Sequence, residues 1–202
     1  YYYIMNSHYD NFKIVQAFKN SLLINERKFN VRLYMLIICK NNSKTVYFHK
    51  YNKLLYAKNK YSESNLLDLE SNVTNSYTTD DLIYKTNPYN LEELKTHISD
   101  ENMGPLINKI HNTIYLLSRV IVLRLGNLEN IKQNTKFQLF GVDIIIDDNY
   151  NPFVLEINKG PDMKPKNDRD KNMKLKVLND MFSKIDLIDE DNYNLYEKIY
   201  SI

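Results

Sequence analysis

The sequence predicts an α+β fold organised around an antiparallel sheet. Apolar, β-branched runs of strand length alternate with Asn- and Asp-rich turns. One long segment repeats its apolar residues with the period of a helix, and two strands late in the chain form a clear hairpin. With 43% hydrophobic and 26% charged residues among 202, the chain can bury the core of one or two ordinary domains.

The strands of the first half form one group. Residues 12–18 (FKIVQAF) are a short apolar run suited to a buried strand. Residues 29–40 are a longer β-branched run, and an Asn-Asn-Ser turn separates them from a second strand at 45–58. We therefore expect 29–58 to form an antiparallel meander.

The helices are expected in the second half. Residues 61–90 are polar and predict a loop. Residues 91–98 predict a short helix, which is followed by a break at Gly104-Pro105. From Leu106 to Leu125 the apolar residues recur every 3.6 positions, which indicates a packed amphipathic helix. Residues 170–185 predict a final basic helix with Lys171, Lys174 and Lys176 on its solvated side.

The clearest hairpin joins residues 137–147 to residues 151–158. A turn from Asp148 to Asn151 pairs Asp147 with Pro152 and places Val154 on the face away from the core. The opposite face is expected to be an unbroken core surface of Phe140, Val142, Ile144, Ile146, Phe153, Leu155 and Ile157.

This register places Asp143 opposite Glu156 and Gly141 opposite Asn158, all on one face. Two carboxylates facing each other within hydrophobic strands repel, and their burial is costly. A divalent cation between them reverses both effects, and oxygen ligands suit Mg²⁺ shared with phosphates better than zinc. The alternative is a solvated pair of acids at a strand edge, which the added Asn158 and the small Gly141 disfavour.

Composition excludes several other classes of site. Four unclustered glycines leave no P-loop or dinucleotide-binding turn, and a single cysteine, Cys39, excludes a disulfide framework and predicts a buried hydrophobe. The net charge of +2 gives no footprint for nucleic acid, and no apolar run is long enough for a membrane span. The histidines, expected on the surface or as hydrogen-bonded core residues, are His8, His49, His97 and His111.

The hairpin also carries a family resemblance. FQLFGVDIIIDDNYNPFVLEINKGP is similar to the C-terminal signature of the tubulin–tyrosine ligase-like family of ATP-grasp ligases, F-x-L-F/Y-G-x-D-x-x-x-D…W-L-x-E-x-N-x-x-P. Upstream, ERKFNVRLYMLI resembles the R-K-F-D-x-R-x-Y/W-x-L strand, and IVQAFKNSLLI resembles the hinge segment V-I-Q-K-Y-x-x-x-P-L-L-L. VTNSY lies where the family has H-L-T-N. These segments follow the family order over about 12–185.

The resemblance implies a role for each matching residue. Asp143, Glu156 and Asn158 would hold the Mg²⁺ ions that bridge the phosphates of ATP. Lys28 and Arg32 would contact the phosphates, or an acyl-phosphate and the incoming amino acid, as the catalytic cations.

Other matching residues would bind the two small substrates. Gln16 and the backbone of Ala17 and Phe18 would line the adenine, and Thr74 and Asn75 would lie beside the free amino acid. The resemblance thus implies an antiparallel ATP-grasp-type sheet with flanking helices.

The resemblance also sets expectations for domain organisation. Residues 1–11 would be a frayed N-terminal segment, 12–188 the central and C-terminal part of the ATP-grasp domain, and 189–202 a C-terminal tail or short helix. The N-terminal part of the fold, with its basic loop over the phosphates, is expected to be missing from this chain.

The function implied is an ATP- and Mg²⁺-dependent ligase. It would attach Glu, Tyr or Gly to a protein carboxylate through an acyl-phosphate, on tubulin or another protein with an acidic tail, in the cytoplasm. An alternative is a degenerate module that binds such a protein without turnover, because Leu55 stands where the family has a second arginine and Lys50 would replace the first. A carbon–nitrogen ligase acting on small peptides is a third reading.

Overall fold

The computed structural model describes residues 2–4, 13–15, 20–65, 68–74, 81–125, 135–189 and 193–202. In chain order the elements are β1 (Tyr2–Ile4), β2 (Lys13–Val15), β3 (Leu23–Ile24), β4 (Arg27–Lys40), β5 (Ser43–Tyr56), α1 (Leu69–Asn72), the 3-10 helix η1 (Asp81–Lys85), α2 (Leu91–Leu94), α3 (Asp100–Arg124), β6 (Lys136–Ile146), β7 (Pro152–Lys159), α4 (Asp168–Lys184) and β8 (Tyr196–Ser201). The predicted α+β class is confirmed.

The main sheet has the strand order β7-β6-β4-β5-β8, and β3 pairs with β4 beside this path. All of its ladders are antiparallel. The predicted pairing of the two long N-terminal strands is confirmed by the β4–β5 hairpin, whose turn residues Asn41 and Asn42 have φ angles of 51° and 61°. Asn tolerates this left-handed conformation better than most residues.

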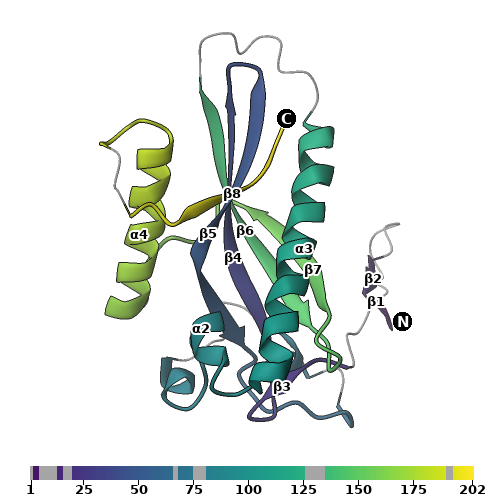
Figure 1. Ribbon diagram of the computed structural model, residues 1–202. Coiled ribbons are helices and arrows are strands. Elements are labelled where there is room, and N and C mark those ends of the chain that lie inside the picture. The colour runs from purple at the N-terminus through teal and green to yellow at the C-terminus, as the bar shows by residue number, and fades with distance from the viewer. Residues whose placement is uncertain are drawn as a thin grey trace.

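Side chains of the central strand β4 alternate between two hydrophobic clusters. Val31, Leu33 and Met35 belong to the cluster that includes α3, whereas Tyr34 and Leu36 belong to the cluster that includes α4. Figure 1 shows these two helices on opposite sides of the sheet. Helix α4 therefore covers the face that carries the even-numbered residues of β4.

Helix α4 is attached to this face by apolar and polar contacts. Met173, Val177 and Met181 pack into the second cluster. On the same helix, Asp180 forms a hydrogen bond with His49, and 2.9 Å separates its Oδ2 from Nε2 of the imidazole. Both side chains are fully buried. His49 is thus a hydrogen-bonded core residue, one of the two roles expected from the sequence, and burial lowers its pKa.

The predicted break at Gly104-Pro105 is wrong, because α3 runs through both residues. The helix starts at Asp100, so Pro105 removes only the hydrogen bond that its amide would donate to the carbonyl of Glu101, near the start of the helix. The buried side chains on either side of the proline include Met103 and Leu106. Their packing stabilises the helix more than the lost bond weakens it.

Between β6 and β7 the predicted register is correct near the paired acids. Asp143 lies opposite Glu156, and Gly141 lies opposite Asn158. Toward the turn the register shifts by one residue after Asp143, which marks a β-bulge.

The predicted pairing of Asp147 with Pro152 is therefore wrong, since Pro152 lies opposite Ile146. Asp147 instead closes the turn: its Oδ1 accepts hydrogen bonds from the backbone amides of Asn149 (3.0 Å) and Asn151 (2.6 Å). The side chain of Asp147 supplies the turn acceptor, as Asp commonly does.

The bulge also corrects the predicted core face of this hairpin. Val154 lies opposite Ile144 and packs against the α3 cluster, not on the other face. Phe153 and Leu155 are 45% and 49% exposed, and Ile157 is 38% exposed on the edge strand. One extra residue in β7 has exchanged the faces of the residues nearer the turn.

The chain ends also differ from expectation. Tyr196–Ser201, expected within a tail or short helix, form strand β8 at the sheet edge beside β5, with Tyr196 buried. Tyr2–Ile4, within the segment expected to be frayed, pair with Lys13–Val15 as a separate two-stranded sheet. Among the described residues, no helix combines the length and apolar character needed to cross a membrane.

A matched pair of substitutions tests the bulge. Ile144 is fully buried and Leu155 is 49% exposed, although both were predicted on the core face. Ile144→Ala should lower the free energy of unfolding by about 2–5 kcal/mol. Leu155→Ala should lower it by less than about 1 kcal/mol. Equal losses in denaturant titrations would contradict the observed register.

Candidate active site

A row of four charged side chains crosses the sheet on the face that α4 partly covers. Lys53 of β5 lies opposite Arg32 of β4, Arg32 lies opposite Asp143 of β6, and Asp143 lies opposite Glu156 of β7. Residues in one register position of neighbouring strands have adjacent side chains. The sheet therefore brings together three of the residues predicted for the site, and it adds Lys53.

The centre of the row is a forked ion pair. The Nη2 of Arg32 donates to Oδ2 of Asp143 at 2.7 Å, and its Nε donates to Oδ1 of the same carboxylate. The side chains are 14% and 5% exposed, so the pair is largely buried. This geometry engages both oxygens of Asp143 with a planar guanidinium.

The missing side chain of Gly141 leaves space for the side chain of Arg32 to reach Asp143 across the sheet. A Cβ at position 141 would lie 3.0 Å from Cβ of Pro161, 3.1 Å from Cδ of Arg32 and 3.2 Å from its Nε. These distances are tighter than most real Cβ contacts, so a larger residue would require Pro161 or the side chain of Arg32 to shift by a few tenths of an ångström.

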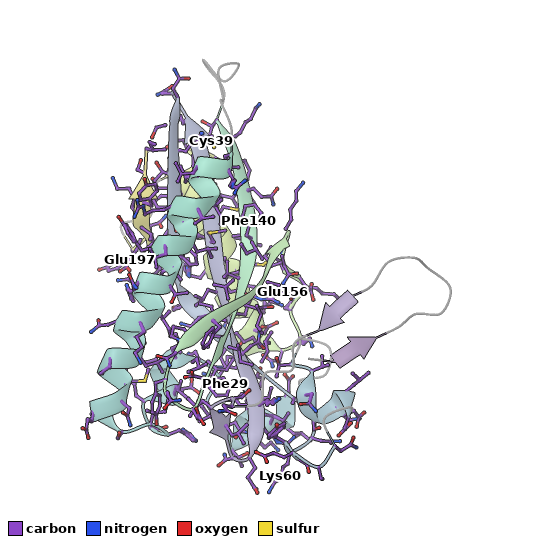
Figure 2. The ribbon with its side chains drawn as sticks, turned by 90° about the vertical axis from the view of Figure 1, so that its right-hand side faces the viewer. Phe29, Cys39, Lys60, Phe140, Glu156 and Glu197 are labelled. Carbon is purple, nitrogen blue, oxygen red and sulfur yellow. The ribbon has the colours of Figure 1, made fainter. Side chains whose placement is uncertain are left out.

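Asn158 connects the two acids. Its Nδ2 donates to Oε1 of Glu156 at 2.8 Å and to Oδ2 of Asp143 at 3.4 Å. Glu156 is exposed on the edge strand, whereas Asp143 lies one strand further in. Figure 2 shows Glu156 on β7, on the other side of α3 from Glu197. The acid pair can thus be reached from the edge of the sheet.

Burial governs the protonation of Asp143. Removal from water raises the pKa of this carboxyl, and the neighbouring Glu156 raises it further, whereas the hydrogen bonds and positive charge of Arg32 lower it. Burial prevails, so the pKa lies above its ordinary value.

Sequence reasoning missed a second charged cluster at the β5 end of the row. Nζ of Lys53 lies 2.8 Å from Oδ1 of Asp170, and Nζ of Lys174 lies 2.9 Å from Oδ2. Tyr89 donates its hydroxyl to the same Oδ1 at 3.1 Å. Although burial alone would raise it, hydrogen bonds from both lysines hold the pKa of Asp170 below its ordinary value.

Lys174, expected on the solvated side of the last helix, is thus buried. The signal available in the sequence was weak, because an acid near a helix start is ordinarily read as favourable to the helix dipole. Only the packing of α4 on the sheet shows that Asp170 at this helix start neutralises Lys53.

Lys28 lies on the same face of β4 as Arg32 but four residues earlier, or about 13 Å along the strand. Its Nζ donates to Oδ1 of Asn72 at 2.9 Å and lies 4.1 Å from the centre of the Tyr61 ring. Burial lowers the pKa of Lys28. The two predicted cations therefore occupy separate ends of this face.

The remaining predicted residues are only partly described. Thr74 forms an isolated bridge with Ala57, the residue whose backbone amide donates to the Lys28 carbonyl, so it lies at the Lys28 end of the face. The predicted residues that lie outside the described ranges are Gln16, Ala17, Phe18 and Asn75.

The two residues of β5 that differ from the family pattern, Leu55 and Lys50, also have clear positions. Leu55 is buried opposite Asn30, two register positions from the charged row. Lys50 forms an exposed ion pair with Glu197 of β8, at 3.1 Å between Nζ and Oε1. The side chain of β5 that joins the row is Lys53, not Lys50.

The residues present fit a magnesium ion shared with phosphates. Asp143, Glu156 and Asn158 offer only carboxylate and amide groups, which suits a hard cation, and few protein ligands leave coordination positions for phosphate and water. Within the described part of the chain, no group of three or more His, Cys, Asp or Glu residues forms an all-protein metal site. This set of oxygen donors does not resemble the ligands of a transition-metal site.

Comparison with known proteins gives the class. The sequence model of the "Tubulin-tyrosine ligase family" matches residues 3–194, so this chain belongs to that family. The fold is that of ATP-grasp enzymes. The C-terminal domain of Pby1 from K. lactis, an ATP-grasp enzyme interacting with the mRNA decapping enzyme Dcp2, superposes with a TM-score of 0.60 at 21% identity, over 90% of this chain and 50% of that one.

Several curated relatives are tubulin-modifying enzymes by name. Tubulin glycylase 3D of Tetrahymena thermophila is 28% identical over 178 residues, covering 83% of this chain and 17% of the relative. A probable tubulin polyglutamylase of Caenorhabditis elegans, ttll-9, is 26% identical and covers 86% and 42%. Inactive polyglycylase TTLL10 of Homo sapiens is 27% identical and covers 74% and 24%. The chain spans less than half of each of these relatives.

Two glycine substitutions test the path of Arg32. Gly141→Ala should lower the free energy of unfolding by about 1–3 kcal/mol, because the new methyl group displaces Pro161 and Arg32. The control is Gly104→Ala on α3, where nothing lies within 4 Å of the added Cβ. The control should stabilise the protein by up to about 1 kcal/mol. A Gly141→Ala variant as stable as the parent in thermal unfolding would show that Arg32 does not need this space.

Proposed function

We propose that this chain carries the metal- and phosphate-binding face of an ATP- and Mg²⁺-dependent ligase that joins the amine of an amino acid to a protein carboxylate through an acyl-phosphate. The observation that carries the proposal is the opposed pair Asp143 and Glu156, bridged by Asn158 and flanked by Arg32, on one face of an ATP-grasp sheet. Family membership supports the reaction class.

Each residue has a defined task in this reaction. Asp143, Glu156 and Asn158 would hold Mg²⁺, which when bound neutralises the charge of the phosphates and orients them. Arg32 offers a fixed, forked guanidinium that matches a phosphate or a carboxylate in two hydrogen bonds. Pre-positioned charges of this kind lower the barrier because they need no reorganisation during the reaction.

Lys28 would act at the other end of the face. A buried ammonium that already lies against Asn72 and Tyr61 is held in one place and can donate to a phosphate oxygen there. The separation of Lys28 from Arg32 along β4 suits an extended ligand such as a nucleoside triphosphate with its acceptor. Gln16, Ala17 and Phe18 are proposed to line the adenine, and Thr74 and Asn75 the amino acid.

The acceptor is proposed to be tubulin or another protein with an acidic tail, and the added residue Glu, Tyr or Gly. The names of the relatives support this choice, since they include tubulin glycylases and polyglutamylases. Such a substrate places the protein in the cytoplasm, at microtubules. Nucleic acid is not proposed as a partner, because the net charge is only +2.

Two observations favour a binding module without turnover as the second candidate. Leu55 is buried and apolar where the family has an arginine, and one relative of similar identity is named inactive. The intact set of Asp143, Glu156 and Asn158 favours the enzyme. The two experiments below separate these candidates.

The first experiment concerns the metal. Glu156→Gln should abolish binding of Mg-ATP, because it removes one of two opposed carboxylates. It should change the free energy of unfolding by less than about 0.5 kcal/mol, since Glu156 is exposed. The matched control is Glu197→Gln, an exposed strand glutamate at the opposite edge of the sheet, which should bind like the parent. Unchanged calorimetric binding by Glu156→Gln would refute the metal assignment.

The second experiment concerns turnover. Arg32→Lys keeps the charge but loses the fork, and it should reduce ligation by about a hundredfold. The assay is incorporation of radiolabelled Glu, Tyr or Gly into tubulin. Arg119→Lys on the exposed side of α3 is the control and should retain full activity. If the parent binds Mg-ATP but incorporates none of the three amino acids, the binding module is the better description.

A further inference from the structure

We propose that Arg32 serves as a resident cation on the metal-binding carboxylate Asp143, so that a metal ion and an anion for Arg32 must bind together. The inference rests on the proposed function, because it takes Asp143 as a metal ligand. It adds a rule for how the site is loaded, namely that metal alone binds weakly and that metal with a bound anion binds well.

Both oxygens of Asp143 already accept hydrogen bonds. Its Oδ1 accepts from Nε of Arg32, and its Oδ2 accepts from Nη2 of Arg32 at 2.7 Å and from Nδ2 of Asn158 at 3.4 Å. A bidentate guanidinium covers the two oxygens that a divalent cation would bind. The two cations therefore compete for one carboxylate.

The side chain of Arg32 is held in place and cannot simply move into water. This side chain is 14% exposed, and its Cδ and Nε lie over Gly141, 3.1 and 3.2 Å from where a Cβ at that position would stand. If a metal ion took Asp143 alone, a largely buried guanidinium would remain beside a divalent cation. A buried charge that loses its partner is strongly unfavourable, and the like charges would repel.

A bound anion removes the penalty of leaving the buried guanidinium without a counter-charge. A phosphate or a carboxylate beside the metal gives Arg32 a new forked partner, so each of the two buried charges again has a counter-charge. Metal, Asp143, anion and Arg32 then alternate in sign. Asp143 would thus exchange its partner Arg32 for the metal ion only when the substrate supplies the oxygens that then bind Arg32.

The other cation of the row does not replace Arg32. Lys53 lies opposite Arg32, but its ammonium is held by Asp170 at 2.8 Å in a buried cluster with Lys174 and Tyr89. Lys53 is therefore committed to α4. Among the described cations, Arg32 is the one whose hydrogen bonds are made to the proposed metal ligand.

The test measures metal binding without turnover. Mn²⁺, an oxygen-binding and paramagnetic substitute for Mg²⁺, is titrated at pH 8 and followed by electron paramagnetic resonance, with and without the β,γ-imido analogue of ATP. The variants are Arg32→Met, which keeps an apolar stem over Gly141, and the matched control Lys40→Met. Lys40 lies on the same strand and pairs at 2.6 Å with exposed Asp186, outside the site. The double variant Arg32→Met/Asp143→Asn completes the set.

Without nucleotide, Arg32→Met should bind Mn²⁺ at least about tenfold more tightly than the parent, because competition and repulsion are both removed. Lys40→Met should match the parent, and the double variant should lose the gain. The analogue should tighten Mn²⁺ binding strongly in the parent and much less in Arg32→Met. If Arg32→Met binds no more tightly than Lys40→Met while the parent binds Mn²⁺ with the analogue, only this inference is overturned. If no variant binds Mn²⁺ even with the analogue, the proposed metal site and this inference both fall.

A measurement on the unaltered protein covers the case in which Arg32→Met does not fold. The Nε–H resonance of Arg32 reports its hydrogen bond to Asp143 in ¹H–¹⁵N spectra. Mg²⁺ alone should leave this resonance in place, and Mg²⁺ with the ATP analogue should shift it. A shift with Mg²⁺ alone at the same concentration, or no shift when Mg²⁺ and the analogue are bound, would overturn the inference.

Discussion

The alternation of side chains along β4 is the constraint on which both the core and the candidate site depend. This strand has 14 residues and lies between β5 and β6 in the sheet. Its odd-numbered residues from Val31 to Ile37 pack in the cluster that includes α3, so its even-numbered residues must face the other way. On that face the first three, Lys28, Asn30 and Arg32, are polar, and the next three pack under α4. The same strand therefore holds the core together and presents the cations of the site.

The charged row is costly for a sheet interior, and its arrangement shows how the cost is reduced. Every buried charge in it has a partner of opposite sign: Arg32 with Asp143, and Lys53 with Asp170. Buried ion pairs of this kind contribute little net stability compared with apolar residues of similar size. Retaining them in the middle of a hydrophobic sheet is consistent with a face that binds charged ligands. Within the row, the two pairs also offset the buried charges of Arg32 and Lys53.

The position of the row within the sheet determines from which side it is accessible. Glu156 lies on the edge strand β7 and is exposed, while Asp143 lies one strand inward and is buried. The bulge after this pair of acids shifts the register toward the turn by one residue and leaves Leu155 and Phe153 exposed, while Asp143 stays opposite Glu156. A ligand approaching from the edge meets Glu156 and Asn158 first and Arg32 last. This order suits a site in which the guanidinium is exchanged only once the anion has arrived.

The sequence by itself determined the local features, because alternation with period two and helical spacing are properties of neighbouring residues. The β4–β5 hairpin, the opposed Asp143 and Glu156, and the amphipathic α3 were all predictable, and the spacing of the motifs identified the family. The tertiary structure alone decided what depends on distant contacts. The bulge in β7 lies between the acid pair and the turn that Asp147 closes, α3 continues past Pro105 because its apolar face is packed, and the buried ammonium of Lys53 is paired because α4 brings Asp170 to it. That Arg32 lies across Gly141 onto Asp143 is a relation between residues more than 100 positions apart, and no local pattern contains it.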